Sequence, residues 1–63
     1  MYIKVTNLES GQSKICDHKK LVKKLMEKGR VSREQRDYFF ENPYYLLKKL
    51  NLIKFNNSIY EEA

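Results

Sequence analysis

Residues 2 to 16 contain two short runs in which apolar and polar side chains alternate, separated by a polar stretch. The first run, residues 2 to 6, mixes β-branched residues with polar ones at a period of two, which is typical of a strand. Residues 7 to 12 are turn formers, and Gly11 among them tolerates a positive φ angle. Residues 13 to 16 then form a second run, so the pattern predicts a β-hairpin over residues 2 to 16.

Residues 17 to 28 change to the period of a helix. Asp17 is a suitable N-cap, because its carboxylate can accept bonds from the free N–H groups of the first turn, and Gly29 closes the helix. On a helical wheel the lysines fill one side and the apolar residues the other. The apolar side consists of His18, Leu21, Val22, Leu25 and Met26. The spacing predicts an amphipathic helix whose apolar side joins the core and is covered by the hairpin.

Two more helices are predicted after this one. Ser32 and Gln35 fit the capping-box pattern at the start of a helix that runs to about residue 41. Pro43 separates it from the next helix, since the residue before a proline disfavours helix while proline suits the first helical position. The third helix is expected over Tyr44 to Leu50.

The end of the chain leaves two possibilities open. Asn51 is expected to be the C-cap of the third helix, and the apolar residues between 52 and 60 surround the pair Asn56-Asn57. Because asparagine tolerates the left-handed backbone, a small terminal hairpin fits this pattern. A single third strand that pairs with the N-terminal hairpin fits it equally. The expected class is α+β, with an N-terminal hairpin, three short helices and a C-terminal strand or small hairpin in one domain.

Composition limits the chemistry that this chain can carry. With 63 residues, 41% of them hydrophobic, the chain can form one globular domain with a small core. Cys16 is the only cysteine and His18 the only histidine, which is too few for a disulfide or a zinc site. We therefore expect no metal and no cofactor. We also expect no membrane segment and no signal peptide, and so a cytoplasmic protein.

Residue usage indicates an origin. Lys, Asn, Ile, Tyr, Phe and Met, which A/T-rich codons encode, account for 29 residues, against 7 for Gly, Ala, Arg and Pro. This bias favours a low-GC bacterium, its phage or its mobile elements as the source. Together with the small size, it predicts an accessory protein of phage or mobile-element type in the cytoplasm of a bacterial host.

The excess of positive charge lies entirely in the first thirty residues, which hold eight basic and three acidic side chains, whereas residues 31 to 63 hold five of each. Most of it forms a lysine ridge on the polar side of the first predicted helix, with Lys14 and Arg30 nearby. The ridge consists of Lys19, Lys20, Lys23, Lys24 and Lys28. Such a ridge attracts phosphates, although a charge-rich face is equally typical of an ordinary solvated surface.

The third predicted helix offers a second candidate contact. Its leucines share one face, and two tyrosine–lysine pairs stand one turn apart on the flanks. The pairs are Tyr44 with Lys48 and Tyr45 with Lys49. A tyrosine beside a lysine can stack on a nucleic-acid base, and it serves equally well as an anchor in a protein interface.

Aromatic residues are numerous for so small a core. Phe39 is expected to be buried, as is Leu46. The remaining aromatic residues of this region cannot all be buried with them, so some are expected to be partly exposed. They are Tyr38, Phe40, Tyr44 and Tyr45.

Residues 46 to 54, Leu-Leu-Lys-Lys-Leu-Asn-Leu-Ile-Lys, are followed by a polar turn and by Ile59-Tyr60. Together this stretch resembles the passage from recognition helix into wing in winged-helix DNA-binding proteins, over residues 43 to 61. The resemblance implies that two lysines face the major groove and that three later residues reach the backbone or the minor groove. The first group is Lys48 and Lys49, and the second is Lys54, Asn56 and Asn57.

Catalysis is not expected. Cys16 and His18 are near neighbours, but adjacent residues at a strand–helix junction usually point apart, and no motif supplies an oxyanion hole. Gly11 and Gly29 are isolated and form no phosphate-binding loop.

Two functions of different classes remain, and both are non-enzymatic. The first is a module that binds nucleic acid or a nucleoprotein through the lysine ridge, with the third helix as a second contact. The second is a modulator, an inhibitor or adaptor, that docks an aromatic patch on a host or viral enzyme. The candidate binding residues are Lys19, Lys20, Lys23, Lys24, Lys28, Tyr44, Tyr45, Lys48, Lys49 and Lys54.

Overall fold

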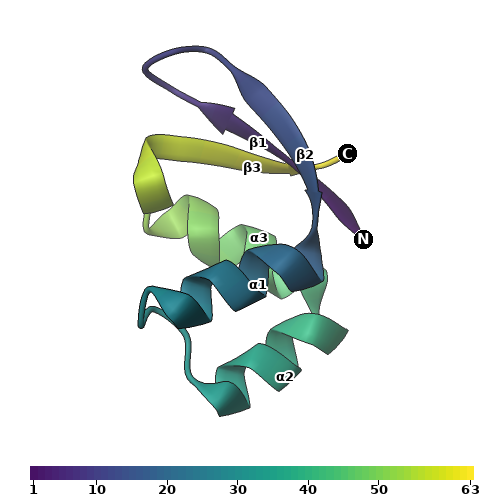
Figure 1. Ribbon diagram of the computed structural model, residues 1–63. Coiled ribbons are helices and arrows are strands. Elements are labelled where there is room, and N and C mark those ends of the chain that lie inside the picture. Colours follow the sequence, from purple (N-terminus) through teal and green to yellow (C-terminus); the bar gives the residue numbers. More distant parts are fainter.

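All three helices lie on one side of a three-stranded antiparallel sheet (Figure 1). The computed structural model describes the whole chain, residues 1 to 63. The elements in order are β1 (Tyr2–Asn7), β2 (Ser13–Asp17), α1 (His18–Glu27), α2 (Arg33–Glu41), α3 (Pro43–Leu52), the short 3-10 helix η1 (Phe55–Asn57) and β3 (Ser58–Glu62). The predicted α+β class is confirmed.

The sheet has the order β2-β1-β3, so the first strand is the central one. β1 and β2 form the predicted N-terminal hairpin, in which Val5 is opposite Lys14. On its other side β1 pairs with β3, where Val5 is opposite Tyr60. Of the two possibilities for the end of the chain, the single strand is therefore the one that forms.

The three helices begin where their capping signals predict. The Asp17 carboxylate accepts the N–H of Lys19 at 3.1 Å, and this bond is the main reason that the pKa of Asp17 is lowered. Ser32 and Gln35 form both bonds of the capping box, at 3.0 and 3.2 Å. Pro43 occupies the first turn of α3. Local side-chain chemistry thus fixes each helix start.

The end of α3 differs from the prediction. The helix continues to Leu52 with Ile53 as its C-cap, so the prediction of Asn51 as C-cap is wrong. The Asn51 side chain instead bonds both backbone groups of Tyr60: its amide donates to the carbonyl at 2.8 Å, and its oxygen accepts from the N–H at 3.0 Å. The chain reverses after the helix at Lys54, whose φ is 49°.

The loop between α3 and β3 uses the left-handed backbone that the asparagine pair predicts. Asn56 and Asn57 have φ angles of 56° and 51°. They belong to η1, and they turn the chain into β3 without forming a terminal hairpin.

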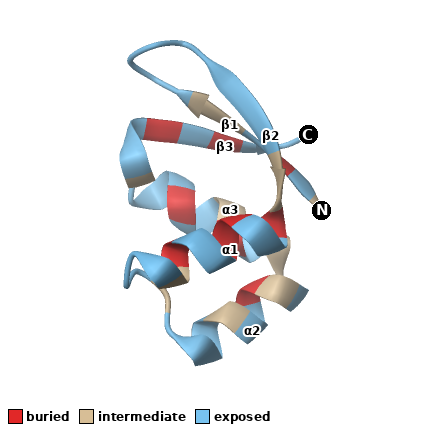
Figure 2. Cartoon of the chain, in the orientation of Figure 1, coloured by how far each residue is buried: buried red, intermediate tan, exposed pale blue.

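The core lies between the sheet and the three helices (Figure 2). It consists of Ile3, Leu21, Val22, Leu25, Phe39, Leu46, Leu50 and Tyr60. The predicted burial of Phe39 and Leu46 is confirmed. The prediction that Met26 belongs to the core is wrong, because Met26 lies in the last turn of α1 at the border between the two sides of the helix and is only half-buried.

His18 packs against this core as predicted, with 6% of its surface exposed, and it is also a hydrogen-bonding centre. Its Nε2 donates to the Phe40 carbonyl oxygen at 2.9 Å. Its Nδ1 lies 3.1 Å from the Met1 carbonyl oxygen and 3.2 Å from an Asp17 carboxylate oxygen. The ring therefore joins the start of α1 to the end of α2 and to the beginning of the sheet.

Candidate functional site: a lysine-lined groove

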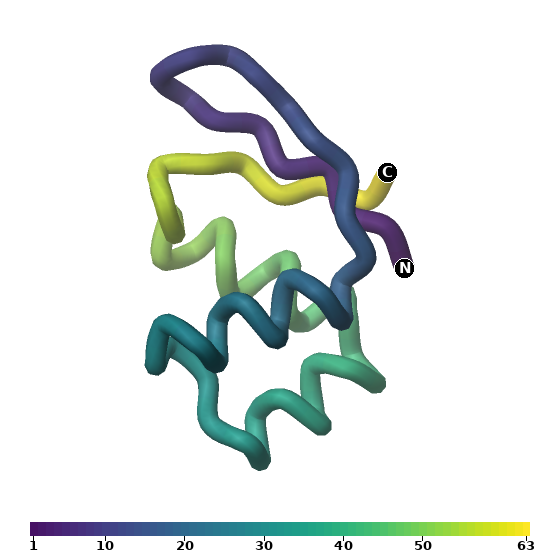
Figure 3. The backbone as a smooth tube through the Cα atoms, viewed as in Figure 1, coloured from purple at the N-terminus to yellow at the C-terminus, as the bar shows by residue number.

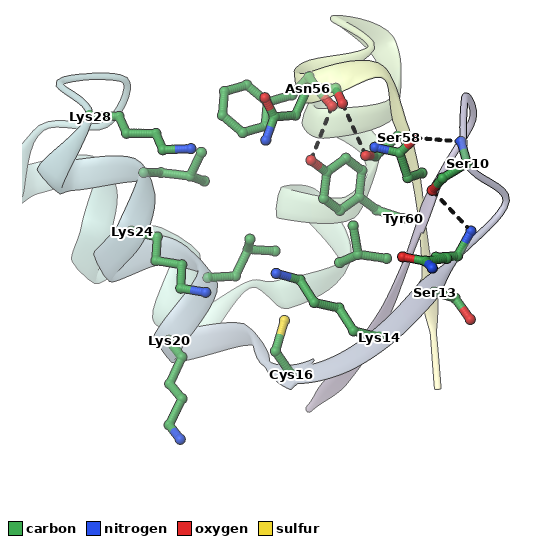
Figure 4. Close-up of a pocket in the computed structure, with 16 residues that line it drawn as sticks. Ser10, Ser13, Lys14, Cys16, Lys20, Lys24, Lys28, Asn56, Ser58 and Tyr60 are labelled. Carbon is green, nitrogen blue, oxygen red and sulfur yellow. Dashed lines mark hydrogen bonds between the residues drawn. The ribbon is translucent and has the colours of Figure 1, made fainter.

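A groove of about 400 Å³ opens between the hairpin and α1, with η1 at one end (Figure 4). Its floor is apolar and includes Val5, Cys16, Leu21 and Leu25. Side chains alternate between the two faces of a strand, so Val5 and Cys16 share the helix-facing side of the sheet with buried Ile3. The groove forms where the hairpin extends past the packed part of the core.

Four lysines line this groove from two elements. The same alternation places Lys14 of β2 on the helix-facing side, opposite Val5. The other three follow one another at intervals of four residues, two on α1 and one at its C-cap, and residues at this interval share a helix face. They are Lys20, Lys24 and Lys28.

Not all four lysine side chains point into the groove. In Figure 4, Lys14 and Lys24 point toward one another from opposite sides, and Lys28 extends toward the groove from the next turn of α1. Lys20 turns outward at the edge. The groove therefore has a central group of three lysines and a fourth at its margin.

No acidic residue lines the groove. The molecule has one ion pair between charged side chains, Arg36 with Asp37, and the Asp17 carboxylate contacts the His18 ring, so neither carboxylate is paired with a lysine. The ammonium groups around the groove thus face one another without a carboxylate between them. A cleft lined by one sign of charge, with a low-dielectric wall, concentrates the field that attracts a counter-ion.

Phe55 closes one end of the groove and is half-buried. The Lys28 ammonium lies 5.9 Å from the centre of its ring, and the Arg30 guanidinium lies 5.6 Å from it. Both distances suit cation–π attraction. These contacts hold Lys28 and one further positive charge, that of Arg30, at the aromatic end of the groove.

The rim carries neutral polar side chains, and two of them have free amides. Asn7 is used internally, since its side-chain oxygen accepts the N–H groups of Glu9 and Ser10 at 2.8 and 3.0 Å. The side-chain amides of Gln12 and Asn56 make no hydrogen bond within the molecule, so they are available to a ligand.

Tyr60 lies at the back of the groove, where its hydroxyl donates to the Phe55 carbonyl oxygen at 3.1 Å. Burial raises the pKa of Tyr60. The phenol therefore stays neutral at physiological pH and adds no negative charge to the groove.

The remaining lysines of the predicted ridge lie outside the groove. Lys19 and Lys23 are exposed on α1, and the Lys19 ammonium lies 5.8 Å from the centre of the Phe40 ring of α2. The ridge is thus divided: Lys20, Lys24 and Lys28 border the groove, and the other two face the α2 side or the solvent.

The two tyrosines of α3 contact different parts of the molecule. Tyr44 donates its hydroxyl to both carboxylate oxygens of Glu62, at 2.9 and 3.0 Å, and this hydrogen bond and the charge of Glu62 raise the pKa of Tyr44. Tyr45 meets Tyr38 edge to face, with ring centres 5.1 Å apart, and stacks on Phe39 at 5.8 Å. The two neighbouring tyrosines therefore belong to different surfaces.

None of the α3 candidates lines the groove. α1 and α3 turn their leucines toward the same core, so their exposed sides point away from each other. Lys49 borders a second, smaller hollow between α2 and α3, together with Tyr38, Phe39 and Tyr45. Lys48 and Lys54 are exposed outside both hollows.

Sequence reasoning did not assign a role to Gln12 or Phe55, it linked Asn56 to nucleic acid only through the winged-helix resemblance, and it placed Lys14 only near the ridge. Strand alternation could have placed Lys14 on the same face as Cys16. Alternation alone does not say that this face of the sheet packs on α1, so the sequence could not place Lys14 in the groove. Nothing local in the sequence indicates that η1 closes the groove.

No family model, curated protein or solved structure matches this chain. The segment that resembles winged-helix proteins folds as α3, η1 and β3, and the resemblance itself stays a prediction. None of the helices has the length and apolar character needed to cross a membrane. No group of three or more His, Cys, Asp and Glu side chains is placed to hold a metal ion.

Proposed function

We propose that this protein binds nucleic acid, free or in a nucleoprotein complex, through the lysine-lined groove and without catalysing a reaction. The observation that carries the proposal is the convergence of Lys14, Lys24 and Lys28 on a groove without acidic residues. A polyanion relieves the repulsion among these charges, and each neutralised phosphate also releases counter-ions. The composition favours an accessory role in a phage or mobile element, within a bacterial host cell.

Lysine contacts of this kind position a nucleic acid but do not distinguish its sequence. We therefore expect binding that is strongly salt-dependent and only weakly selective for sequence. Lys20 at the margin and Arg30 at the Phe55 end extend the same positive surface.

A matched pair of double variants tests the proposal. Lys24→Gln with Lys28→Gln removes two charges from the groove, whereas Lys19→Gln with Lys23→Gln removes two charges from the same helix outside it. Each variant loses two positive charges, so the two variants have the same net charge as one another. Affinity for labelled DNA and RNA is measured by fluorescence anisotropy at several salt concentrations.

The groove variant is expected to lose affinity and to lower the slope of log K against log salt by about 2, one unit for each lost phosphate contact. The control variant is expected to keep the slope of the wild type. Equal losses in both variants would show a bulk charge effect and rule out the groove. Absence of wild-type binding to DNA and RNA at low salt would reject the proposal entirely.

A second candidate function is supported by the hollow between α2 and α3. Tyr38 and Tyr45 are 51% and 42% exposed, and their edge-to-face contact holds both rings beside Phe39 and Lys49. Exposed tyrosines in a fixed arrangement are typical anchors of protein interfaces. This is the surface on which a modulator would dock a host or viral enzyme.

The two tyrosines of α3 supply the test of this second function. Tyr45→Ala should weaken capture of a protein partner from nuclease-treated lysate, whereas Tyr44→Ala, on the other flank of α3, should retain it. Equal capture by both variants would exclude the hollow as the docking site.

A further inference from the structure

We infer that the groove receives an unstacked base of a single-stranded nucleic acid, while the lysines hold the neighbouring phosphates. The inference rests on the proposed function and specifies the ligand. It follows from the shape of the groove, the spacing of its lysines and the two free amides on its rim.

The apolar floor favours a base that has left its stack. Val5, Cys16 and Phe55 are half-buried and face the groove. In a duplex the bases are stacked and paired inside the helix, so its phosphates would meet the lysines but the apolar floor would stay uncovered. The bases of a single strand can turn outward and bury a flat apolar surface against a protein wall.

The lysines are spaced for consecutive phosphates. Lys24 and Lys28 are one helical turn apart, which is a rise of about 6 Å along α1. Neighbouring phosphates of one strand are separated by a comparable distance. Lys14 faces them from β2, so a strand that runs along α1 has positive charge on both sides and the floor beneath it.

The two free amides reach the groove from two different parts of the chain. Gln12 is at the end of the hairpin loop and Asn56 is in η1, and both line the groove. Each amide carries two donor hydrogens and one acceptor oxygen, so it can pair with the mixed donors and acceptors of an exposed base edge.

An acidic helix fits this groove less well. A helix that docks in a groove presents one apolar face, with anchors spread over at least two turns. Two of the apolar side chains of the floor, Leu21 and Leu25, are buried in the core, so the groove offers few exposed positions for such anchors. A single base needs only one flat apolar contact, and this favours the strand.

Three labelled probes of equal length and one competitor test this inference on the wild-type protein. The probes are a single strand, the same strand in a duplex, and an abasic strand that keeps only sugars and phosphates. The competitor is unlabelled poly-glutamate. We expect the intact single strand to bind at least about fivefold more tightly than the abasic strand or the duplex, as the stacking of one base allows.

A pair of variants locates the base. Asn56→Gly removes the rim amide and Asn57→Gly removes an amide outside the groove, and glycine suits the left-handed backbone at both positions. Asn56→Gly should reduce the preference for the intact strand over the abasic strand, whereas Asn57→Gly should preserve it.

Each outcome separates this inference from the function on which it rests. Equal affinity for intact, abasic and duplex probes would overturn the inference and leave nucleic-acid binding in place. At equal charge, poly-glutamate could displace the labelled strand as effectively as the unlabelled single strand does. That result would assign the groove to an acidic protein and overturn the inference. Failure to bind any nucleic acid would overturn the inference and the proposed function together.

Discussion

Tyr44 shows how a single contact changes the chemistry of an exposed residue. It is 64% exposed, and its hydroxyl donates to both oxygens of Glu62. A phenolate at this position would lose the hydrogen bond and stand beside a carboxylate, so the pKa of Tyr44 is raised above its ordinary 10.0. The side chain that sequence analysis offered as a partner contact is thus partly engaged within the molecule.

The contact predicts a specific pH dependence. Because the pKa of Tyr44 is raised in the folded state, the hydrogen bond to Glu62 contributes fully to stability below pH 10. This contribution is lost as the pH rises through the raised pKa. Glu62→Gln should return the pKa of Tyr44 toward 10.0. NMR titration of the tyrosine rings measures it.

Glu61→Gln is the matched control for this titration. Glu61 precedes Glu62 on β3 and therefore points to the other face of the sheet, where Lys4 is its partner on β1. Its replacement should leave the pKa of Tyr44 unchanged. The same pKa in wild type and Glu62→Gln would show that the bond does not form in solution.

At the scale of elements, Asn51 joins the end of α3 to the open edge of β3. β3 is an edge strand, so the outward N–H and C=O of Tyr60 have no neighbouring strand. The Asn51 amide bonds both groups. In this way one side chain replaces a strand at this position, and it occupies an edge that could otherwise pair with another chain.

Replacing Asn51 should therefore destabilise the fold more than its exposed position suggests. Asn51→Ala leaves the two Tyr60 groups without their partner and should cost about 1–3 kcal/mol in urea unfolding. Asn51→Asp should cost more at pH 7 than at pH 3, because a carboxylate cannot donate to the Tyr60 carbonyl. Lys48→Ala, exposed on the same helix, should stay within about 0.5 kcal/mol. A loss for Asn51→Ala no larger than for Lys48→Ala would contradict this role.

Asn51 also shows where sequence reasoning about the elements ends. The starts of the helices could be predicted from Asp17, Ser32 and Pro43, because capping depends on residues within one turn. An asparagine near a helix end has two uses that the sequence does not distinguish, a cap or a bond to a distant strand. The choice depends on where β3 packs, and that is a tertiary property.

At the scale of the whole molecule, the lysines of the groove leave an electrostatic repulsion in the free protein. Lys14 and Lys24 approach from different elements, and neither forms an ion pair. Repulsion between exposed charges is modest and is screened by salt. Added anions should therefore stabilise the fold more than uncharged solutes do.

Removing one of these charges should stabilise the free protein. Lys14→Gln should raise the melting temperature at low salt by about 1–3 °C, which corresponds to a few tenths of a kcal/mol for a domain of this size. The gain should disappear in 1 M salt. Lys48→Gln, outside the groove, should produce no gain at either salt concentration. A melting temperature for Lys14→Gln that is unchanged or lower at low salt would contradict the repulsion.

The candidate site was predictable only in part. A helical wheel suffices to place the α1 lysines on the surface, and all of them are exposed. That Lys14 faces Lys24 depends on the register of the hairpin and on the face that meets α1. The separation of Tyr44 from Tyr45 depends on contacts with β3 and α2, which are distant in sequence.

The two ends of the chain meet beside the sheet, where the N–H of Ala63 donates to the Tyr2 carbonyl oxygen at 3.0 Å (Figure 3). They lie at the end of the sheet away from the hairpin loop, which forms one border of the groove. A dye, a bead or a fused protein attached at either terminus would therefore leave the groove open. A short linker between the termini would also permit circular permutation, with new ends placed away from Gly29, because its neighbours Lys28 and Arg30 border the groove.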